Sequence, residues 1–210
     1  MMTDRRRPRL PGRVLGAAGL AAAVGAIALL ATGYTSATVS GDAMNPTYPR
    51  GDRVFFERVD ASEVGRGDVV LHRSQDGHEN RPVLRRVIGV GGDHVSQSPG
   101  GPVTVNGEPL TEPYVKDGDP SGSAPAYDVV VPEGALFLLG DHRANSNDSR
   151  YSLAAHSGGV PATSVQARAL DSHTGLLLLV LTALLGVLGA AVGLTMEIAS
   201  RTPARTADRT

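Results

Sequence analysis

Two long stretches of the chain carry no charged residue, and they lie near its two ends. The first runs from Val14 to Gly41 and the second from Thr174 to Met196. About 20 consecutive apolar residues are enough for a helix to cross the hydrocarbon core of a bilayer. The pattern therefore predicts two transmembrane helices, over residues 14–34 and 174–196.

The residues that flank these stretches predict their orientation. Five arginines and one aspartate precede Val14, and an excess of basic residues marks the cytoplasmic side of a span. Residues 1–13 are therefore expected to form a cytoplasmic tail. A small excess of arginine in residues 197–210 predicts a second cytoplasmic tail. Residues 35–173 are then expected to form one external domain.

Each apolar stretch has an alternative interpretation. Residues 1–38 combine a basic start, an apolar run and small residues around Ser36, which also fits a cleaved secretory signal. The run is longer than a usual signal core, so we favour an uncleaved anchor. The second stretch could be a buried core helix, but a helix that is apolar on every face at the end of a small domain fits a span better.

The region between the two stretches has a different pattern. Gly, Pro, Asp and Ser recur every few residues and separate short runs rich in β-forming residues: Arg53–Arg58, Asp68–His72, Leu84–Val90, Val103–Val105, Val129–Val131 and Leu136–Leu139. Short strands between turn signals predict a mainly β domain. Ser74–Pro82 and Lys116–Pro125 are expected to be exposed loops, and the polar tail after Arg201 to be disordered.

Composition limits the available chemistry. Among 210 residues there is no cysteine, which excludes disulfides, cysteine nucleophiles and cysteine-ligated metals. The net charge of −1 gives no attraction toward nucleic acid, so no such partner is expected. Lys116 is the only lysine. We expect neither a metal nor a cofactor, because no metal-ligand spacing occurs among the scattered histidines His72, His78, His94, His142, His156 and His173.

Six sequence blocks carry the residues of chemical interest in a fixed order. They read VSGDAMNPT (39–47), RGDRVFFERV (50–59), RGDVVLHR (66–73), VLRRVIGVGGDHV (83–95), VTVNG (103–107) and FLLGDHRANSNDSRY (137–151). The set resembles the type I signal peptidases of the peptidase S26 family, membrane-bound serine proteases that cleave signal peptides from secreted preproteins. The resemblance covers about residues 39–169, and its most specific part is GDHR followed by S-x-DSRY. Paired spans around the domain also resemble the actinobacterial and other Gram-positive members.

The resemblance implies a Ser–Lys dyad, and both of its positions are substituted here. In the family, a serine just before the methionine of the first block attacks the scissile carbonyl, and a lysine takes the serine proton. Ala43 stands at the serine position and Arg85 at the lysine position. A methyl group cannot attack, and a guanidinium with a pKa above about 12 has no lone pair to accept a proton. We therefore expect impaired catalysis.

Three residues are candidates to replace the dyad. Lys116 lies in a loop far along the chain from Arg85 and is expected to be a solvated surface amine. Ser40 is the nearest hydroxyl upstream of Ala43, but in an extended segment these two side chains point to opposite faces. It would reach the site only with a local bulge. His142 stands where many relatives have asparagine, and structural hydrogen bonding is its expected role.

The resemblance also implies supporting residues. Ser146 matches the serine that hydrogen-bonds the lysine amine. The family also has a charged cluster that shapes the site from behind, and four residues match it: Asp141, Arg143, Asp148 and Arg150. Without the dyad, we expect this cluster to hold its loop through mutual ion pairs. Three residues match family positions that line the site: Gly41, Met44 and Pro46. Met44 fits core packing equally well.

The substrate surface of the family is a shallow apolar groove. It takes an extended signal-peptide segment with small residues at two alternate positions, much like an added strand. Loss of the dyad does not remove such a groove. The leading interpretation is a two-span plasma-membrane homologue, embedded in the lipid bilayer, that binds signal peptides or assists an active paralogue. Two alternatives stay open: an active signal peptidase with an unorthodox nucleophile, and a structural membrane ectodomain with no peptide ligand.

Overall fold

The computed structural model describes residues 10–73, 82–156 and 158–201. The chain divides into two compact units, one formed by the residues up to Gly33 together with those from Ser172 onward, and one by Tyr34–Asp171. Three expectations fall outside the described residues: those for the arginine-rich start, for most of the loop at 74–82, and for the tail after Arg201.

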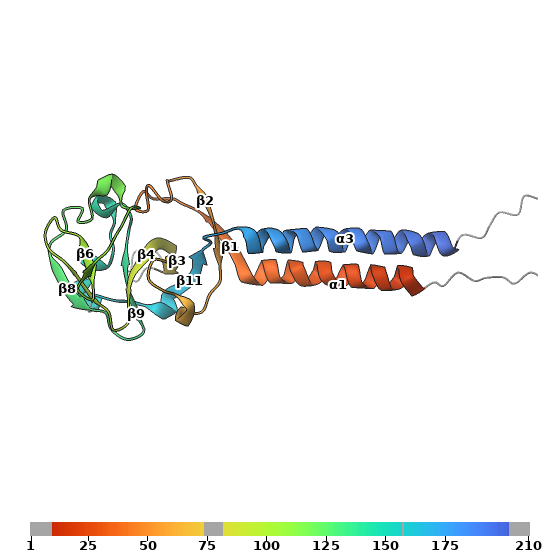
Figure 1. The fold of residues 1–210 in the computed structure, drawn as a ribbon, viewed down its shortest axis with the longest axis horizontal. Coiled ribbons are helices and arrows are strands. Elements are labelled where there is room, and N and C mark those ends of the chain that lie inside the picture. Colours follow the sequence, from red (N-terminus) through yellow and green to blue (C-terminus); the bar gives the residue numbers. More distant parts are fainter. Residues whose placement is uncertain (1–9, 74–81, 157, 202–210) are drawn as a thin grey trace, which may run out of the picture. The chain divides into compact units, whose positions relative to one another are not determined.

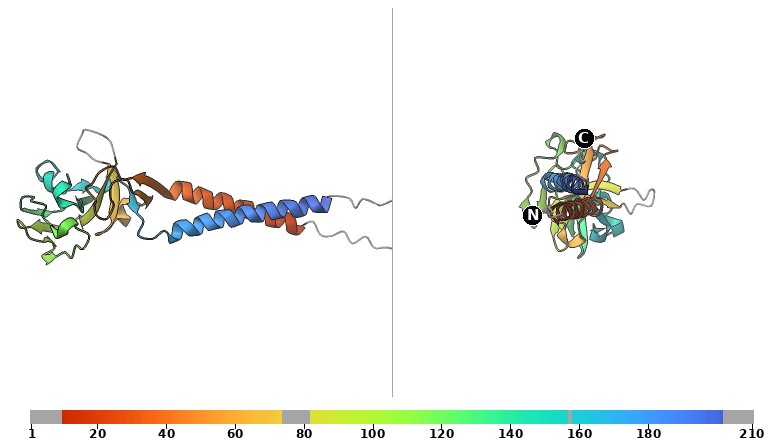
Figure 2. Two further views of the ribbon diagram at one scale, coloured as in Figure 1. Left: turned by 90° about the horizontal axis from the view of Figure 1, so that it is seen from above. Right: turned by 90° about the vertical axis from the view of Figure 1, so that its right-hand side faces the viewer.

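The first unit is a pair of helices that lie side by side, α1 (Leu10–Gly33) and α3 (Thr174–Arg201) (Figure 2). They run antiparallel, because the start of α1 meets the end of α3: Arg13 Nε donates to Glu197 Oε1 at 3.0 Å. Small residues allow the two backbones to approach closely. A Cβ added to Gly19 would lie 2.6 Å from both the Gly186 carbonyl oxygen and the Ala190 nitrogen.

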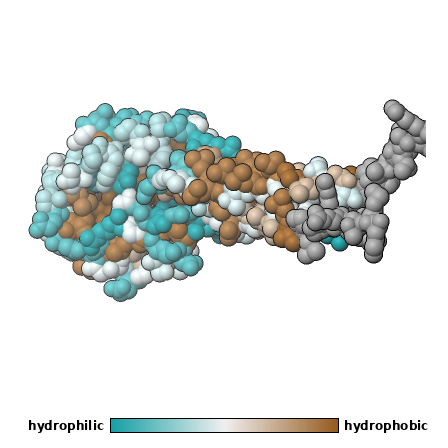
Figure 3. Space-filling model, turned by 45° about the vertical axis from the view of Figure 1, so that its right-hand side comes forward, coloured by the Kyte–Doolittle hydropathy of each residue, from teal (hydrophilic) through white to brown (hydrophobic). Residues whose placement is uncertain are grey.

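Both helices are long and apolar enough to cross a membrane, over Gly12–Gly33 and Thr174–Ser200. Their outward-facing side chains are large and apolar, and on the face drawn in Figure 3 hydrophobic residues cover the helices, whereas hydrophilic residues predominate over the β-rich unit. The helices extend past the uncharged stretches because charged residues are tolerated at helix ends, where Arg13 and Glu197 pair.

The second unit is built from two antiparallel sheets (Figure 1), and the prediction of a mainly β domain is confirmed. The larger sheet has the order β1 (Tyr34–Thr38), β2 (Arg53–Glu57), β11 (Val165–Ala169), β3 (Val69–Arg73), β4 (Pro82–Val90), β9 (Ala135–Leu139), β10 (Val160–Pro161). The smaller has the order β7 (Glu108–Pro109), β6 (Val103–Val105), β5 (His94–Gln97), β8 (Tyr127–Val130).

Short helical turns connect the strands. One is α-helical, α2 (Leu153–His156). The others are 3₁₀ turns at Ala61–Glu63, Lys116–Gly118, Arg143–Asn145, Ser149–Tyr151 and Ala162–Ser164. Two of them, Arg143–Asn145 and Ser149–Tyr151, carry the arginines of the last sequence block and fix where these side chains start.

The core lies on both faces of the central strands. In β9, Phe137 and Leu139 pack with the smaller sheet, whereas Leu136 and Leu138 pack on the opposite face, against Val70 of β3 among others. Since successive side chains of a strand alternate between faces, burial on both sides requires an uninterrupted apolar run. This explains why the sequence of β9 is continuously apolar.

The interpretation of Lys116–Pro125 as an exposed loop is wrong for its second half. Ser121 and Ala124 are buried. Two arginines hold this segment against the domain: Arg143 Nη1 donates to the Pro120 carbonyl at 2.8 Å, and Arg150 Nη1 donates to the Ser121 carbonyl at 2.7 Å. A polar composition predicted exposure, but hydrogen bonds to its main chain make burial possible.

Candidate functional site

A groove of about 470 Å³ opens between the chain that leaves β1 and the first half of β4. We call it the β1–β4 groove. Its walls are mostly small or apolar, and Arg85 is the only charged residue among the described residues that line it: Ala37, Thr38, Val39, Ser40, Gly41, Ala43, Met44, Phe56, Leu71, Pro82, Val83, Leu84 and Arg85. Ala43 and Arg85, which the resemblance places at the two dyad positions, therefore line one groove.

The first half of β4 has a strand partner on one side. Pro82–Arg86 pairs with β3, but β9 pairs with β4 only from Arg86 onward. Within the described chain, the other edge of Pro82–Arg85 is therefore not covered by a strand of the sheet. Such an edge can accept an extended segment through main-chain hydrogen bonds.

Arg85 is only 8% exposed although it lines the groove. Its Nη1 donates to the Leu84 carbonyl at 2.7 Å, and its Nη2 donates to the Asn147 carbonyl at 2.8 Å. These bonds anchor the guanidinium to β4 and to the loop of the last sequence block. They place a cation at the position where the family resemblance expects a lysine amine.

Ser146, the residue expected to contact that amine, is buried behind Ala43. Its Oγ has no hydrogen-bond partner among the residues that the structure describes. Gly140 separates it from the first block, and a Cβ added to Gly140 would lie 2.6 Å from the Ala43 carbonyl oxygen and against Ser146 Oγ. Only glycine fits between Ala43 and Ser146.

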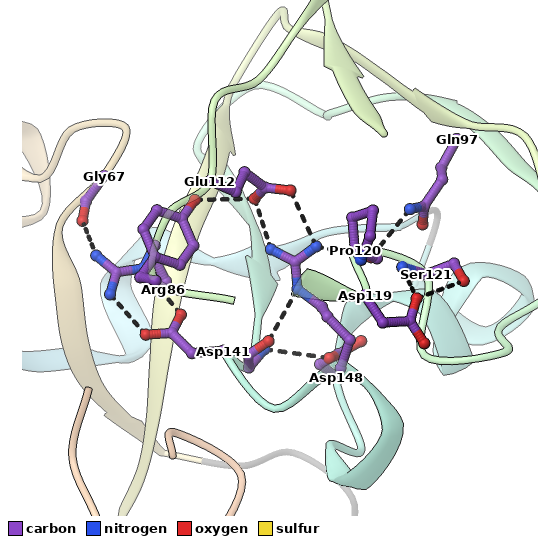
Figure 4. Close-up of polar contacts among 12 residues, drawn as sticks. Gly67, Arg86, Gln97, Glu112, Asp119, Pro120, Ser121, Asp141 and Asp148 are labelled. Carbon is purple, nitrogen blue, oxygen red and sulfur yellow. Dashed lines mark hydrogen bonds and ion pairs between the residues drawn. The ribbon is translucent and has the colours of Figure 1, made fainter. Parts of the chain in front are cut away.

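Behind the groove lies a network of buried ion pairs (Figure 4). Arg86 binds both carboxylate oxygens of Asp141, with Nε–Oδ1 at 2.9 Å and Nη2–Oδ2 at 2.6 Å. Arg150 binds both oxygens of Asp148 at 2.8 and 2.9 Å. Such two-pronged bonds satisfy charges that would otherwise be costly to bury.

Arg143 completes this network with a different partner from the one expected. Its Nη2 donates to Glu112 Oε1 at 2.6 Å and its Nη1 to Glu112 Oε2 at 3.2 Å. The expectation of mutual pairing within the last block therefore holds only for Asp148 and Arg150. Asp141 pairs instead with Arg86 of β4, because the strand brings that side chain to the loop.

Four residues of the network were not anticipated. Arg86 and Glu112 supply ion-pair partners, Thr47 Oγ1 donates to Asp141 Oδ2, and the ring of Tyr114 lies 3.9 Å from the Arg86 guanidinium carbon. Alternation along β4 could have identified Arg86, since it must face away from Arg85. Glu112 lies in a segment with no recognisable pattern, so no sequence signal indicates it.

The charges of this network are strongly stabilised. Burial opposes the charge of Arg86, but its hydrogen bonds to Asp141 and that carboxylate's charge outweigh burial and raise the pKa of Arg86. The pKa of Arg150 is raised in the same way by Asp148. Burial, followed by the charge of Glu112, raises the pKa of Tyr114. Arg86 and Arg150 are therefore charged and Tyr114 is neutral at neutral pH.

Next to Ala43, the Asp42 carboxylate meets two cationic or potentially cationic side chains. His142 Nδ1 donates to Asp42 Oδ2 at 2.9 Å, and Lys116 Nζ lies 3.8 Å from the same oxygen. Burial opposes the charge of Asp42, but bonds from Asn45 and His142 and the charge of Lys116 lower its pKa. Lys116, expected to be a solvated surface amine, keeps 30% of its side chain exposed and does not line the groove, but its amine lies beside Asp42 and its backbone nitrogen donates to the Asp141 carbonyl.

The first block turns after β1 and is not extended as assumed. Main-chain turns follow Ser40, so the strict alternation of an extended strand does not apply, and both Ser40 and Ala43 line the β1–β4 groove. Met44 lines the groove as well and is also 1% exposed in the core. Pro46 is exposed and is not among the lining residues.

No group of three or more His, Cys, Asp or Glu side chains within the described ranges is arranged to hold a metal ion. Within the described residues, the site consists of an apolar groove, the arginine that lines it and the buried ion pairs behind it.

A comparison with protein families decides which family the chain belongs to. The family model described as "Signal peptidase, peptidase S26" matches residues 13–171, most of the chain. The chain belongs to this family. The resemblance read from the sequence blocks is thereby confirmed at the level of the family, and the β1–β4 groove occupies the part of the chain that the model covers.

Individual relatives match a shorter part of the chain. Signal peptidase I S of Bacillus subtilis is 33% identical over 125 residues, which is 55% of this chain and 65% of that protein. Mitochondrial ATP-independent inner membrane protease subunit 1b of Arabidopsis thaliana is 33% identical over 133 residues, which is 62% of this chain and 64% of that protein. The chain thus spans just under two thirds of the length of these relatives.

One solved structure that resembles the chain is a signal peptidase I from Enterococcus faecalis. It is 26% identical, with a TM-score of 0.39, and the match covers 50% of this chain and 95% of that one.

Proposed function

We propose that this chain is a signal-peptidase homologue of the plasma membrane that binds signal-peptide segments in the β1–β4 groove without cleaving them. The observation that carries this proposal is the position of Ala43 and Arg85 in one groove. They stand where the family reaction needs a nucleophile and a base, and neither can do that work.

The chemistry of the groove supports the absence of cleavage. Covalent catalysis needs a nucleophile with a proton acceptor beside it. Ser40 and Thr38 bring hydroxyls to the groove, but Arg85 is the only charged residue among the described lining residues, and its guanidinium cannot accept a proton at neutral pH. Neither His142 nor Lys116 lines the groove among the described residues. Ser40 would have to attack as a neutral hydroxyl.

The shape of the groove supports peptide binding. Small and apolar residues form its walls, and the edge of β4 at Pro82–Arg85 faces no strand of the described sheet on the groove side. An extended peptide would hydrogen-bond to such an edge, and every second side chain would point into the groove. This fits a segment with small residues at alternate positions, as the family resemblance implies for signal peptides.

Site-specific photo-crosslinking tests binding. A photoreactive residue at Val83, which lines the groove, should capture an added signal peptide when the full-length protein is in membranes. The matched control is Val130 in β8, an exposed valine of the smaller sheet. Equal capture at both positions, or none at either, would favour a structural ectodomain with no peptide ligand.

A second candidate function, an active peptidase, is favoured by one observation: Ser40 lines the groove. A preprotein cleavage assay with the purified full-length protein separates the two. We expect no cleavage above that of a mock preparation from cells lacking the gene. Cleavage that Ser40→Ala abolishes would overturn the proposal and make Ser40 the nucleophile.

We also propose that both chain ends are cytoplasmic and that residues 35–173 lie outside, as in the Gram-positive members with paired spans. The arginines before Val14 support this orientation, and the antiparallel packing of α1 and α3 supports ends on the same side. A reporter fused after Thr210 should be active only as a cytoplasmic reporter. Activity only outside would reverse the orientation or remove one span.

A non-cleaving binder of this kind can assist an active paralogue by holding signal peptides near it. Deletion of the gene should then slow preprotein processing while the paralogue's level stays constant. Normal processing in the deletion strain would remove the assisting role and leave the binding role in place.

A further inference from the structure

Three titratable side chains from three different segments meet at the turn that carries Ala43. Asp42 belongs to this turn, Lys116 to a 3₁₀ turn, and His142 to the last sequence block. His142 Nδ1 donates to Asp42 Oδ2 at 2.9 Å, and Lys116 Nζ lies 3.8 Å from the same oxygen. We call these three residues the rim trio. One carboxylate in it is shared by two side chains that can carry positive charge.

The rim trio lies against the wall of the β1–β4 groove. Gly41 and Ala43, the neighbours of Asp42 in the chain, both line the groove, and the His142 backbone nitrogen donates to the Ala43 carbonyl at 2.9 Å. The side chains of Asp42, Lys116 and His142 remain 37%, 30% and 17% exposed. A ligand at this part of the groove would therefore be close to their charges.

The Ala43 side of the groove is one of its two ends. Every neighbouring pair from β1 through β2, β11 and β3 to β4 is antiparallel, so β1 and β4 run in the same direction. Ala37 and Pro82 accordingly lie toward one end of the groove, and Ala43 and Arg85 toward the other. The family resemblance expects the scissile bond at Ala43. The residues that follow this bond in a preprotein would leave the groove at the rim trio.

We propose that the rim trio selects peptides by the charge of the residues that follow the segment bound in the groove. It favours acidic side chains there over basic ones, and the preference strengthens when His142 is protonated. This inference rests on the proposed function, since it specifies which of the peptides that enter the groove bind most tightly.

The distances involved are short enough for such a preference. An extended chain advances about 3.3 Å per residue, so the first two residues beyond the groove stay within about 7 Å of its end. Exposed charges interact over about 10 Å at an ionic strength of 0.1 M. Glutamate or lysine side chains at these two positions are therefore within range of the charges of the rim trio.

The net charge of the rim trio depends on His142. While the imidazole is neutral, the Asp42 carboxylate and the Lys116 ammonium balance each other. An imidazole gains a proton as the pH falls from about 8 to 5, and the trio then carries one net positive charge. Burial opposes the charge of Asp42, but bonds from Asn45 and His142 and the charge of Lys116 lower its pKa. The carboxylate therefore stays charged over this range.

Other ionisable groups on the elements around the rim trio keep one state over the same range. Carboxylates and guanidinium groups are charged between pH 5.5 and 7.5, and burial raises the pKa of Tyr114, which stays neutral. His72 of β3 follows Leu71, which lines the groove, and so faces the other side of the sheet. The carboxylate and guanidinium groups belong to Arg85, Arg86, Glu112, Asp117, Asp119, Asp141 and Arg143.

Binding of three fluorescent peptides to the purified full-length protein in a nonionic detergent tests the inference by anisotropy. All share one signal-peptide segment ending in Ala-x-Ala, and they continue with two glutamates, two glutamines or two lysines before the same neutral amidated end. At pH 5.5 the glutamate peptide should bind most tightly. Its affinity relative to the lysine peptide should be about fivefold higher than at pH 7.5, since one added charge acts with opposite sign on the two.

Variants then assign the preference to the rim trio. His142→Asn should remove the change in preference between the two pH values, and Lys116→Gln should weaken the preference for the glutamate peptide at both. His94→Asn is the matched control, because His94 also pairs with an aspartate, Asp128, but lies in the smaller sheet outside the lining residues. The glutamine peptide reports folding, and its affinity should stay unchanged in all three variants.

The outcomes separate this inference from the proposed function. Equal binding of the glutamate and lysine peptides at both pH values would overturn the inference and leave the peptide-binding role standing. A pH-dependent preference that survives His142→Asn would overturn it as well. No binding of any peptide would overturn both.

Discussion

Arg85 and Arg86 are neighbours on β4, but they belong to two different regions of the molecule. Arg86 points into the buried network, where it binds both oxygens of a fully buried Asp141. Arg85 points to the β1–β4 groove and donates to two main-chain carbonyls. The first region is closed and held by charge pairs, whereas the second opens into a groove.

This difference determines which of the two regions carries information about catalytic activity. The network joins β4, the segment around Glu112 and the last sequence block, and it would be needed to fold that loop whether or not any reaction takes place. Its presence therefore does not indicate activity. The proposed chemistry of the site rests instead on two residues that line the groove, Ala43 and Arg85.

The largest expected effect is the loss of stability when Arg86 is replaced, compared with the same replacement of its neighbour Arg85. Arg86→Met should lower the free energy of unfolding by about 3–5 kcal/mol, because it leaves the buried Asp141 carboxylate without its cation. Arg85→Met should cost less, about 1–3 kcal/mol, because it removes the charged donor of two hydrogen bonds to main-chain carbonyls. Denaturant unfolding of the detergent-solubilised protein measures both. Equal losses would contradict the division into two regions.

A second pair of variants compares glycines from the two regions. Gly140→Ala should cost about 1–3 kcal/mol, because the new Cβ would lie 2.6 Å from the Ala43 carbonyl oxygen. Gly41→Ala should change stability by less than about 0.5 kcal/mol, since nothing lies within 4 Å of its Cβ. Because Gly41 lines the groove, its variant should instead alter peptide affinity. A Gly140→Ala protein as stable as wild type would show that the contact between Ala43 and Ser146 behind the groove is not tightly packed.

The smallest expected effect is a pH-dependent change in stability that comes from the contacts of Asp42 beside the β1–β4 groove. Asp42 has a pKa lowered below 3.8 by Asn45, His142 and Lys116. A carboxylate with a lowered pKa stabilises the fold at pH values above about 3.8, and this contribution is lost as the pH falls through the lowered value. Wild type should therefore melt slightly above Asp42→Asn at pH 6, and the difference should shrink as the pH falls below 3.8. A constant difference between these pH values would contradict the role of the Asp42 charge.

Much of the fold could be predicted because its signals are local. The two helices follow from uncharged stretches, and β6 was predicted with its observed bounds, Val103–Val105. β11 and β1 were missed, since their alanines, serines and threonines give weak alternation, and their pairing with β2 comes from distant parts of the chain. Long-range pairing of this kind leaves no local pattern.

The sequence blocks predict which positions belong to the site. They do not predict the contacts between blocks. The blocks located Ala43 and Arg85, which share one groove. The partners of Asp141 and Arg143, and the approach of Lys116 to Asp42, depend on where loops meet in space. Only the fold provides that information.

The most direct measurement of the central claim is preprotein cleavage by the double variant Ala43→Ser/Arg85→Lys. The account predicts no cleavage by wild type or by either single variant, and slow cleavage by the double variant. A lysine at this buried position would have a lowered pKa, and Ser146 Oγ, which has no partner among the described residues, could position its amine. Cleavage by the unmodified protein, or a folded double variant that does not cleave, would contradict the account.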